Sequence, residues 1–573
     1  MARAACMARL TVCRILLLAT LGHCDPFNRS HWQTGLLKLI EKGVEVSDEP
    51  MTIIGKLPPW LSGSLYRNGP GAFTNERGDQ KVNGAFDGYA AVQKFDLSAG
   101  THSMRFLQSS RYKQLQKRGD MSYQGKIMMG TTPPRKENHL DVMNMGGEVS
   151  VNFVDMKDAK GHHLLALGEL PFGLELNAST LETIDGADHS YFKFNDSIAD
   201  TGMGCAHPIK LPNGDLISKI ALIPTSKFGG RTDYTIFRIP AGTSRRETLA
   251  TFSKWEMGIT YAHAFPIASA RYAILPFWPL KMSKASTLIA NNMIDGMHYR
   301  PQDGTHLTVV DLVTGAATTY RANETFYGFH FSNAFVTKDA DGNDHEIVAD
   351  VVLTSSNAFS SLMLDAFRNG SAIDHMVMSG PLRRIRIPLS TSWTRGEGTS
   401  CLGDCNEQNM QMPERLASAV ATLEYLPGEG SRVLLEAPRI NDAWLMSPNY
   451  RYVYGWHPTR ADNYPNAVVK LDVHTGAFSR WVDPKDEFDA MMGEAIFVPA
   501  PARLDAMQRR EETTQTTQAE DDGVVISSGL QISTGRAFVL ILNATTFQEM
   551  ARVYARTHVT FGFHSQFYPK FDV

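Results

Sequence analysis

Four histidines have a setting unlike that of most other histidines in the chain. They occur in GCAHPIK, TYAHAFP, YGFHFSN and FGFHSQF, and they are His207, His263, His330 and His564. Each lies among small or aromatic apolar residues beside a strand-like run. Neutral imidazoles bind Fe, Cu, Zn or Ni, and four of them meeting at one point would leave room for O₂ on the metal.

Two observations bear on how these four histidines are interpreted. The set of four contains histidines and no cysteine, which disfavours a structural zinc site, because such sites prefer thiolates. For any one histidine taken alone, the alternative is a hydrogen-bonded side chain in the core. Other histidines, such as His162 and His163 in GHHLLA, lie in polar stretches and are interpreted as solvated loop residues.

The elements that must position the histidines are short strands joined by tight turns. In three hairpin-like runs an Asp ends one alternating stretch and a Gly follows four residues later: Asp96 and Gly100, Asp311 and Gly315, Asp472 and Gly476. Asp accepts backbone hydrogen bonds in such a turn, and Gly adopts the positive φ that closes it. LELNAST and LILNATT have the same form with Asn.

Long helical periodicity is scarce, so the chain is predicted to be all-β and closed on itself. A β-propeller accommodates this length without long exposed strand edges. Its inner strands meet at the axis, where histidines distant in sequence could converge on one metal ion.

The motifs that surround these histidines resemble the carotenoid cleavage oxygenase family. LYRNGPG, FDGYAAVQKFD, CAHP, YAHAF, FHFSNAF, GEAIFVPAP, EDDGVV and FGFHSQF occur in the family's order, from about residue 60 to the end. The resemblance implies a seven-bladed β-propeller with one Fe²⁺ on its axis and a helical or loop cap over a substrate tunnel. It also implies that the four histidines are the iron ligands.

The resemblance further implies three glutamates behind the ligands: Glu169 in LALGELP, Glu436 in LLEAPRI and Glu494 in GEAIF. A carboxylate that accepts the outer N–H of an imidazole fixes the ring's tautomer and orientation. The alternative for each is a partner in a surface salt bridge.

The implied reaction is a dioxygenase reaction with O₂ as co-substrate. A carbon–carbon double bond of a carotenoid or apocarotenoid is split into aldehyde or ketone products, and no side chain is required as acid or base. Candidates for lining the tunnel, each of which could equally be plain core, are Phe265, Phe277, Trp278, Phe326, Tyr327 and Phe329.

Two other functions are compatible with the same fold. Cleavage of a stilbene or phenylpropene needs a Lys and a Tyr near the substrate hydroxyl, for which Tyr112 with Lys126 or Lys136 are candidates. A non-catalytic carotenoid-binding propeller is the second, although a binder has no need of four iron ligands.

The composition and the N-terminal segment indicate which partners and which cellular compartment the chain has. The net charge of −4 and the lack of a basic stripe argue against nucleic acid, and no protein partner is predicted. Residues 1–24 have three arginines, then an apolar run, which is typical of a secretory signal; a mitochondrial presequence is the alternative. Six N-x-S/T sequons, at Asn28, Asn177, Asn195, Asn323, Asn369 and Asn543, fit secretion.

Residues 25–573 are predicted to form one propeller domain. The polar stretch 503–523 is predicted to be an exposed insertion. The run Leu275 to Ala290 mixes apolar residues with Lys281 and Lys284, and the resemblance implies that it rests on a membrane surface. Cys401 and Cys405 could close a small disulfide loop in an oxidising compartment.

Overall fold

The computed structural model describes most of the chain from residue 43 onward. The residues between 43 and 573 that it does not describe are 120, 122–129, 134–147, 172, 185–190, 223–229, 257, 261, 283–293, 356–362, 365–378, 390–392, 396–414, 460–464, 502–518, 558–559, 561 and 570–573. Within the described part, one α-helix, α3 (Ser110–Arg118), accompanies the strands, and no helix is long and apolar enough to cross a membrane. The all-β prediction is confirmed.

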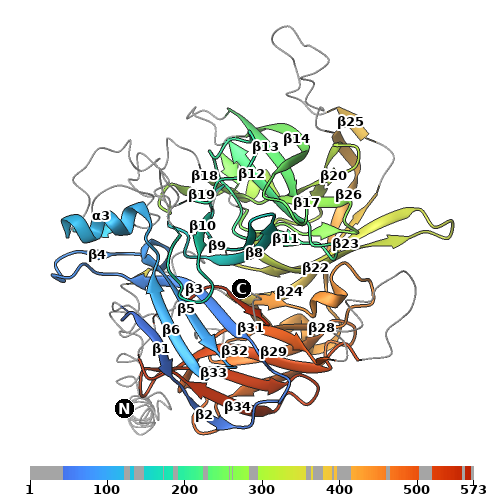
Figure 1. Cartoon of the computed structure of the whole chain (residues 1–573). Helices are drawn as coiled ribbons and strands as arrows, with labels where there is room; N and C mark the ends of the chain where they lie inside the picture. The colour runs from blue at the N-terminus through green and yellow to red at the C-terminus, as the bar shows by residue number, and fades with distance from the viewer. Residues whose placement is uncertain are drawn as a thin grey trace, which may run out of the picture.

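The two ends of the described chain are interlocked where the first sheet meets the last. The C-terminal strand β35 (Ser565–Tyr568) pairs with β3 (Ser64–Ala72) of the first sheet, and β2 (Thr52–Gly55) pairs with β34 (Glu549–Tyr554) of the last. Figure 1 shows the blue first sheet beside the red last sheet. The exchange of strands joins the first sheet to the last and so closes the array. The other strands of these sheets are β1 (Val46–Pro50), β5 (Tyr89–Asp96), β6 (Thr101–Phe106), β31 (Ala490–Pro499), β32 (Gly523–Gln531) and β33 (Arg536–Asn543).

Antiparallel sheets follow one another between these two. The second and third sheets consist of β8 (Asn152–Asp158), β9 (Gly161–Leu167) and β10 (Gly173–Leu176), then β11 (Ile209–Lys210), β12 (Leu216–Leu222), β13 (Gly230–Ile239) and β14 (Glu247–Glu256). Three groups of four strands come next. The first consists of β16 (Ile267–Ala268), β17 (Tyr272–Phe277), β20 (His306–Asp311) and β21 (Ala317–Ala322), and the second of β22 (Gly328–Lys338), β23 (Asp344–Leu353), β24 (Gly380–Pro388) and β26 (Arg415–Tyr425). The third consists of β27 (Leu434–Arg439), β28 (Tyr452–His457), β29 (Ala467–Asp472) and β30 (Phe478–Val482). Pairing of β21 with β26 and of β24 with β27 joins these three groups into one ladder.

Short elements complete the described fold. They are β4 (Lys81–Val82), β7 (Thr131–Thr132), β15 (Ile259–Thr260), β18 (Leu280–Met282), β19 (Met297–Tyr299), β25 (Trp393–Arg395), and the 3₁₀ turns η1 (Ala85–Asp87), η3 (Pro301–Asp303), η7 (Gly428–Arg432) and η8 (Asp442–Trp444).

The core lies between neighbouring sheets rather than inside any one of them. Leu65 of β3 and Val539 of β33 share one buried cluster, and Val92 of β5 and Ala166 of β9 share the next. Sheets with two buried faces, each packed on the next around a closed array, form a β-propeller. The blade number, the cap and the single domain 25–573 stay predictions.

The Asp–Gly turns form as the sequence predicts. The Asp96 carboxylate accepts the N–H groups of Ser98 and Ala99 at 3.0 and 2.9 Å, and Gly100 has φ 68°. The turns that begin at Asp311 and Asp472 have the same bonds. The Asn turns depart in one respect: the left-handed position holds Leu181 (φ 62°) and Phe547 (φ 58°) instead of Gly.

The predicted exposed insertion is wrong at its C-terminal end. Most of it, like the 1–24 leader, Cys401 and Cys405, lies outside the described residues. Glu520 and Asp521 are both 7% exposed. Glu520 accepts the N–H groups of Arg451 and Tyr452, and Asp521 pairs with Lys470. A polar sequence predicted an exposed insertion here, whereas both carboxylates are buried, Glu520 against backbone N–H groups and Asp521 against the buried Lys470.

Candidate metal centre

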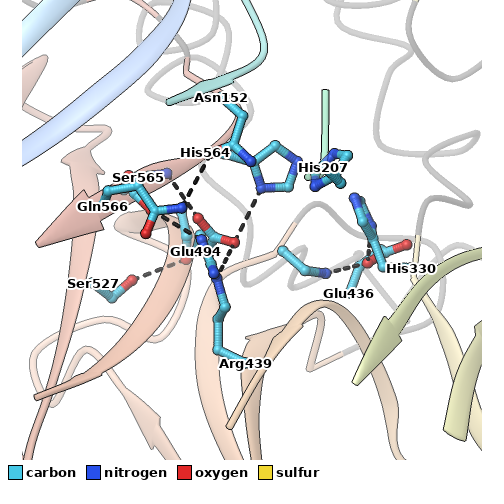
Figure 2. Close-up of polar contacts among 12 residues, drawn as sticks. Asn152, His207, His330, Glu436, Arg439, Glu494, Ser527, His564, Ser565 and Gln566 are labelled. Atoms are coloured by element: carbon cyan, nitrogen blue, oxygen red, sulfur yellow. Dashed lines mark hydrogen bonds and ion pairs between the residues drawn. The ribbon is translucent and has the colours of Figure 1, made fainter. Parts of the chain in front are cut away.

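Four imidazoles from distant parts of the chain converge at one point. His207 precedes β11, His263 lies between β15 and β16, His330 is within β22, and His564 precedes β35. One nitrogen from each ring can be chosen so that all four lie within 4.8 Å of one another. Figure 2 shows the rings of His207, His330 and His564 turned toward a common space. The structure therefore brings together the four residues expected to bind the metal.

β-Bulges direct three of the side chains at this site. Along β22, Gly328 pairs with Leu353 but Phe331 pairs with Val351, so one extra residue is accommodated beside His330. The same irregularity occurs at Glu436 in β27 and at Glu494 in β31. A bulge breaks the strict alternation of a strand and re-aims a side chain, which explains how pleated strands present these groups to one centre.

Buried asparagines hold the loops that carry His207 and His564. The backbone of His564 donates to Val151 O at 3.1 Å and accepts from Asn68 N at 3.0 Å. The Asn68 amide donates in turn to Asn152 O at 2.8 Å, and the Asn152 amide donates to the carbonyl of Ala206, beside His207. The positions of His207 and His564 are thus coupled through one network.

Three of the four rings have a buried glutamate behind them. Nδ1 of His330 lies 2.8 Å from Glu436, Nδ1 of His564 lies 3.0 Å from Glu494, and Nδ1 of His263 lies 2.6 Å from Glu169. The exposed fractions of Glu169, Glu436 and Glu494 are 8%, 0% and 2%. That burial excludes a surface salt bridge for any of them. A carboxylate accepts hydrogen bonds, so Nδ1 carries the hydrogen and Nε2 keeps its lone pair for a metal.

Local backbone geometry fixes two of these carboxylates. Glu436 also accepts the N–H of the next residue, Ala437, which adopts a left-handed conformation (φ 49°) within the bulge. Glu494 accepts Ser565 N at 2.7 Å and Arg439 Nε at 2.7 Å. The sequence did not predict that Arg439 binds Glu494. The bulge between Glu436 and Arg439 determines where the Arg439 side chain points, and the sequence does not reveal that bulge.

Burial keeps three of the four rings in the form that can bind a metal. Burial and the other imidazoles hold the pKa of His207 well below its usual range, and burial lowers the pKa of His263 to about 4 against the opposing effect of Glu169. Burial likewise lowers the pKa of His564. The rings of His207, His263 and His564 are therefore neutral near neutral pH, as metal ligation requires.

The donor set fits a divalent cation. Nε2 of His330 is buried and has no hydrogen-bond partner among the described residues, and Nε2 of His207 and His263 lie 2.6 Å apart. These lone pairs are directed at shared space that a cation would occupy. A divalent ion and Arg439 would together balance the charge of the three glutamates, which neutral imidazoles leave uncompensated.

The six aromatic residues expected near the tunnel are all buried, and some contact the site directly. Phe329 stacks on His263 with centroids 4.4 Å apart and planes 2° from parallel. Trp278 contacts both Phe326 and Tyr327. The exposed fractions of Phe265, Phe277, Trp278, Phe326, Tyr327 and Phe329 are between 1% and 6%. Their role as a tunnel lining stays a prediction.

The structure also bears on two other predictions, the solvated His163 and the phenol-binding Tyr112. His163 is 8% exposed and lies 2.8 Å from Asp158 and 2.6 Å from Glu175, so the prediction of a solvated loop residue is wrong. Tyr112, the candidate for binding a phenol, is buried and stacks on Phe106 at 4.9 Å. Lys126 and Lys136 lie outside the described residues.

Comparison with known proteins places the chain in a family. Residues 41–569 match the family model described as "Retinal pigment epithelial membrane protein". The chain belongs to this family, the carotenoid cleavage oxygenases.

Its relatives span nearly the whole chain. It is 26% identical to carotenoid cleavage dioxygenase 8 of Arabidopsis thaliana over 91% of this chain and 83% of the relative. It is 25% identical to human beta,beta-carotene 15,15'-dioxygenase over 91% of this chain and 92% of the relative. A solved structure of a Synechocystis apocarotenoid oxygenase variant superposes with a TM-score of 0.72 at 20% identity, over 95% of this chain and 99% of that one. The propeller architecture agrees with that fold.

Proposed function

We propose that this family member is an Fe²⁺-dependent dioxygenase that cleaves a carbon–carbon double bond of a carotenoid or apocarotenoid into aldehyde or ketone products. The observation that carries the proposal is the cluster of four imidazoles, each of which offers one nitrogen that lies within 4.8 Å of the others. The names of the relatives, carotenoid cleavage dioxygenase and beta,beta-carotene 15,15'-dioxygenase, support the substrate class.

His207, His263, His330 and His564 would hold the iron, one ion per chain. All-imidazole coordination suits Fe²⁺ and leaves positions for O₂, and the ion supplies the oxygen chemistry when it is bound. Glu169, Glu436 and Glu494 keep the outer nitrogens of three rings protonated and hold those rings in orientation. No side chain acts as acid or base in the proposed reaction.

The surrounding residues position the substrate and exclude water. Phe329 covers one face of the His263 ring, and Trp278 with its aromatic neighbours makes the adjacent wall apolar. A long polyene has no polar groups along its length, so such a wall binds it by burial and aligns one double bond with the metal.

The run Leu275 to Ala290 is not an exposed surface where the structure describes it: Leu275, Phe277 and Leu280 are 2–3% exposed, and residues 283–290 lie outside the described part. We further propose contact with a membrane surface through other residues, and passage through the secretory pathway. Trp255 and Leu222 are 57% and 41% exposed, and the strand register puts them on one face at one end of the third sheet. Exposed apolar residues there would let a lipophilic substrate enter from lipid. The arginine-containing leader supports secretion, with mitochondrial import as the alternative.

Product analysis under labelled oxygen tests the proposed reaction. Protein purified without oxygen is assayed for metal, then incubated with ¹⁸O₂ and β-carotene, an apocarotenal or a hydroxystilbene, and the products are identified by mass spectrometry. We expect about one iron per chain and labelled carbonyl products from a polyene. Cleavage of the stilbene alone, or polyene bound without any oxygen-dependent product, would contradict it.

A further inference from the structure

A buried cation lies against the loop that carries His564. Arg67, on β3, is 7% exposed, and its backbone pairs with Ser565, which follows that histidine. Its Nη2 lies 3.5 Å from the carbonyl oxygen of Gly562, and its Nε is buried with no hydrogen-bond partner among the described residues. A Cβ atom on Gly562 would overlap this Nε, so the guanidinium rests directly on the backbone there. Arg67 thus contacts the loop on both sides of His564.

A second buried cation lies against the loop that carries His263. Lys219, on β12, is 5% exposed, and its Nζ lies 3.4 Å from the carbonyl oxygen of Ala262, which precedes that histidine. No carboxylate oxygen of the described residues lies within 4.0 Å of the charged group of Lys219 or of Arg67. Both charges are therefore withdrawn from water without an ion-pair partner, which is destabilising.

The nearest compensation for Arg67 is a carboxylate that already has another partner. Burial lowers the pKa of Arg67 to about 10, against the opposing charge of Glu494, so the guanidinium stays charged near neutral pH. Glu494 accepts Arg439 Nε at 2.7 Å. One carboxylate thus serves two guanidinium groups.

The two cations add to the charge of the metal centre. A divalent ion and Arg439 together balance the three glutamates behind the rings. Arg67 and Lys219 come in addition to that set and have no carboxylate of their own. Coulomb repulsion grows with the charge of the ion, so each of them raises the free energy of a trivalent ion more than that of a divalent one.

We infer that Arg67 and Lys219 hold the bound iron in its divalent state. The inference rests on the proposed function, which supplies the iron, and concerns the oxidation state in which the site is kept. The event that the two charges oppose is the loss of one electron from the divalent ion to O₂ without cleavage of substrate. They oppose it from beside the ligand loops, without contacting the metal or the substrate.

The alternative is that the two side chains only anchor their loops. Each donates to a loop carbonyl, and a displaced loop would carry its histidine away from the metal. The two roles predict opposite effects on a divalent ion. Removing a nearby positive charge relieves repulsion and favours binding of the ion, whereas removing an anchor weakens it.

Redox poising tests the role of the charge. Arg67→Met and Lys219→Met remove the charge, while Arg67→Lys and Lys219→Arg keep it. Each full-length protein is loaded with Fe²⁺ without oxygen and poised at one potential with mediators, and trivalent iron is measured by EPR. We expect the ratio of trivalent to divalent iron to rise about 10-fold in each Met variant, as for one charge about 10 Å from the ion, and by less than about threefold in the other two.

Binding of Zn²⁺, which has no redox chemistry, separates charge from anchoring. Its affinity is measured by competition with a chelator. We expect each Met variant to bind Zn²⁺ at least as tightly as the wild type. If Arg67→Met does not fold, Arg67→Gln removes the same charge and takes its place in both measurements.

Lys94→Met is the matched control. Lys94 is also a buried lysine, on β5, and it donates to a backbone carbonyl, that of Ser179, at 2.7 Å. Ser179 follows β10 in a turn that carries none of the four histidines. This variant removes a distant buried charge, so its iron ratio and Zn²⁺ affinity should stay within about twofold of the wild type.

The outcomes separate this inference from the proposed reaction. An unchanged iron ratio in both Met variants, or a loss of Zn²⁺ affinity by about 10-fold or more in both, would overturn the role of the two charges. Failure of the wild type to form any oxygen-dependent product would overturn the proposed reaction, while a shifted iron ratio with intact Zn²⁺ binding would still support the inference.

Discussion

Arg439 and His564 donate to the same oxygen of Glu494, Arg439 through Nε at 2.7 Å and His564 through Nδ1 at 3.0 Å. Burial raises the pKa of this carboxyl, but the charges and hydrogen bonds of Arg439 and His564 outweigh it and hold the pKa well below its usual range. Glu494 is therefore ionised near neutral pH. Arg439 belongs to β27, as Glu436 does, so one strand serves two ligand histidines.

Replacing Glu494 by Gln should lower metal affinity by about 10- to 100-fold without unfolding the chain, because the amide cannot balance the ion's charge and can present its NH₂ to His564. Arg439→Met should lower it too, since the carboxylate loses a donor. Iron per folded chain measures both effects. Unchanged iron content and turnover in both variants would show that the Glu494 contact does not tune the metal.

Replacing His207, His263, His330 or His564 by Ala should each abolish turnover and reduce bound iron by at least about tenfold. His457→Ala is the control, because His457 is also buried but its Nδ1 faces the carbonyl of Leu434 at 2.6 Å. That variant should lose stability and keep its iron. Full iron occupancy in any of the first four would remove that histidine from the ligand set.

The backbone at Ala437 offers a test of the bulge. A residue other than Gly with φ 49° is strained by about 1–2 kcal/mol, and a β-branched side chain is strained further. Ala437→Gly should fold with iron retained, whereas Ala437→Val should shift Glu436, release His330 and lose iron. Thermal unfolding and metal analysis report the two effects separately. Equal iron in the two variants would mean that the bulge does not set the position of Glu436.

Acid should destabilise the metal-free protein through its buried neutral histidines. Burial lowers the pKa of His102 and of His263 to about 4 from 6.5. Between these values the unfolded chain binds more protons than the folded one, so the free energy of unfolding falls as pH decreases from about 6.5 toward 4. Each histidine contributes at most about 3 kcal/mol to this loss.

The variant His102→Met tests how much His102 contributes to the loss of stability in acid. Neither nitrogen of His102 has a partner among the described residues, and its ring packs on Phe95 with centroids 4.7 Å apart. The variant should fold, and its stability should fall less steeply with acid than that of the wild type. Denaturant titrations at several pH values measure the difference. Identical pH profiles would show that His102 is not a buried neutral group.

Sequence reasoning succeeded where structure is local and failed where it depends on pairing between strands. The turn from Asp96 to Gly100 is determined within five residues, so its form could be predicted. The location of His163 could not, because Glu175 reaches it only through the pairing of β9 with β10. Arg439 was missed for a related reason: the β-bulge that brings it to Glu494 has no signature in the sequence.

The stretch 503–523 divides into two parts with opposite expected behaviour. Deleting residues 505–518 should leave iron content unchanged and stability within about 0.5 kcal/mol, because this segment has too little apolar surface to join a core. Asp521→Asn should cost about 3–5 kcal/mol, because Nζ of Lys470 lies 2.5 Å from the Asp521 carboxylate and the amide would leave that ammonium buried without its counter-charge. Lys470 keeps one other acceptor, the carbonyl of Ala544 at 2.7 Å, which cannot replace the charge. Chemical denaturation of the two variants measures the contrast. Insoluble protein after the deletion, or unchanged stability of Asp521→Asn, would show that the boundary between insertion and core lies elsewhere.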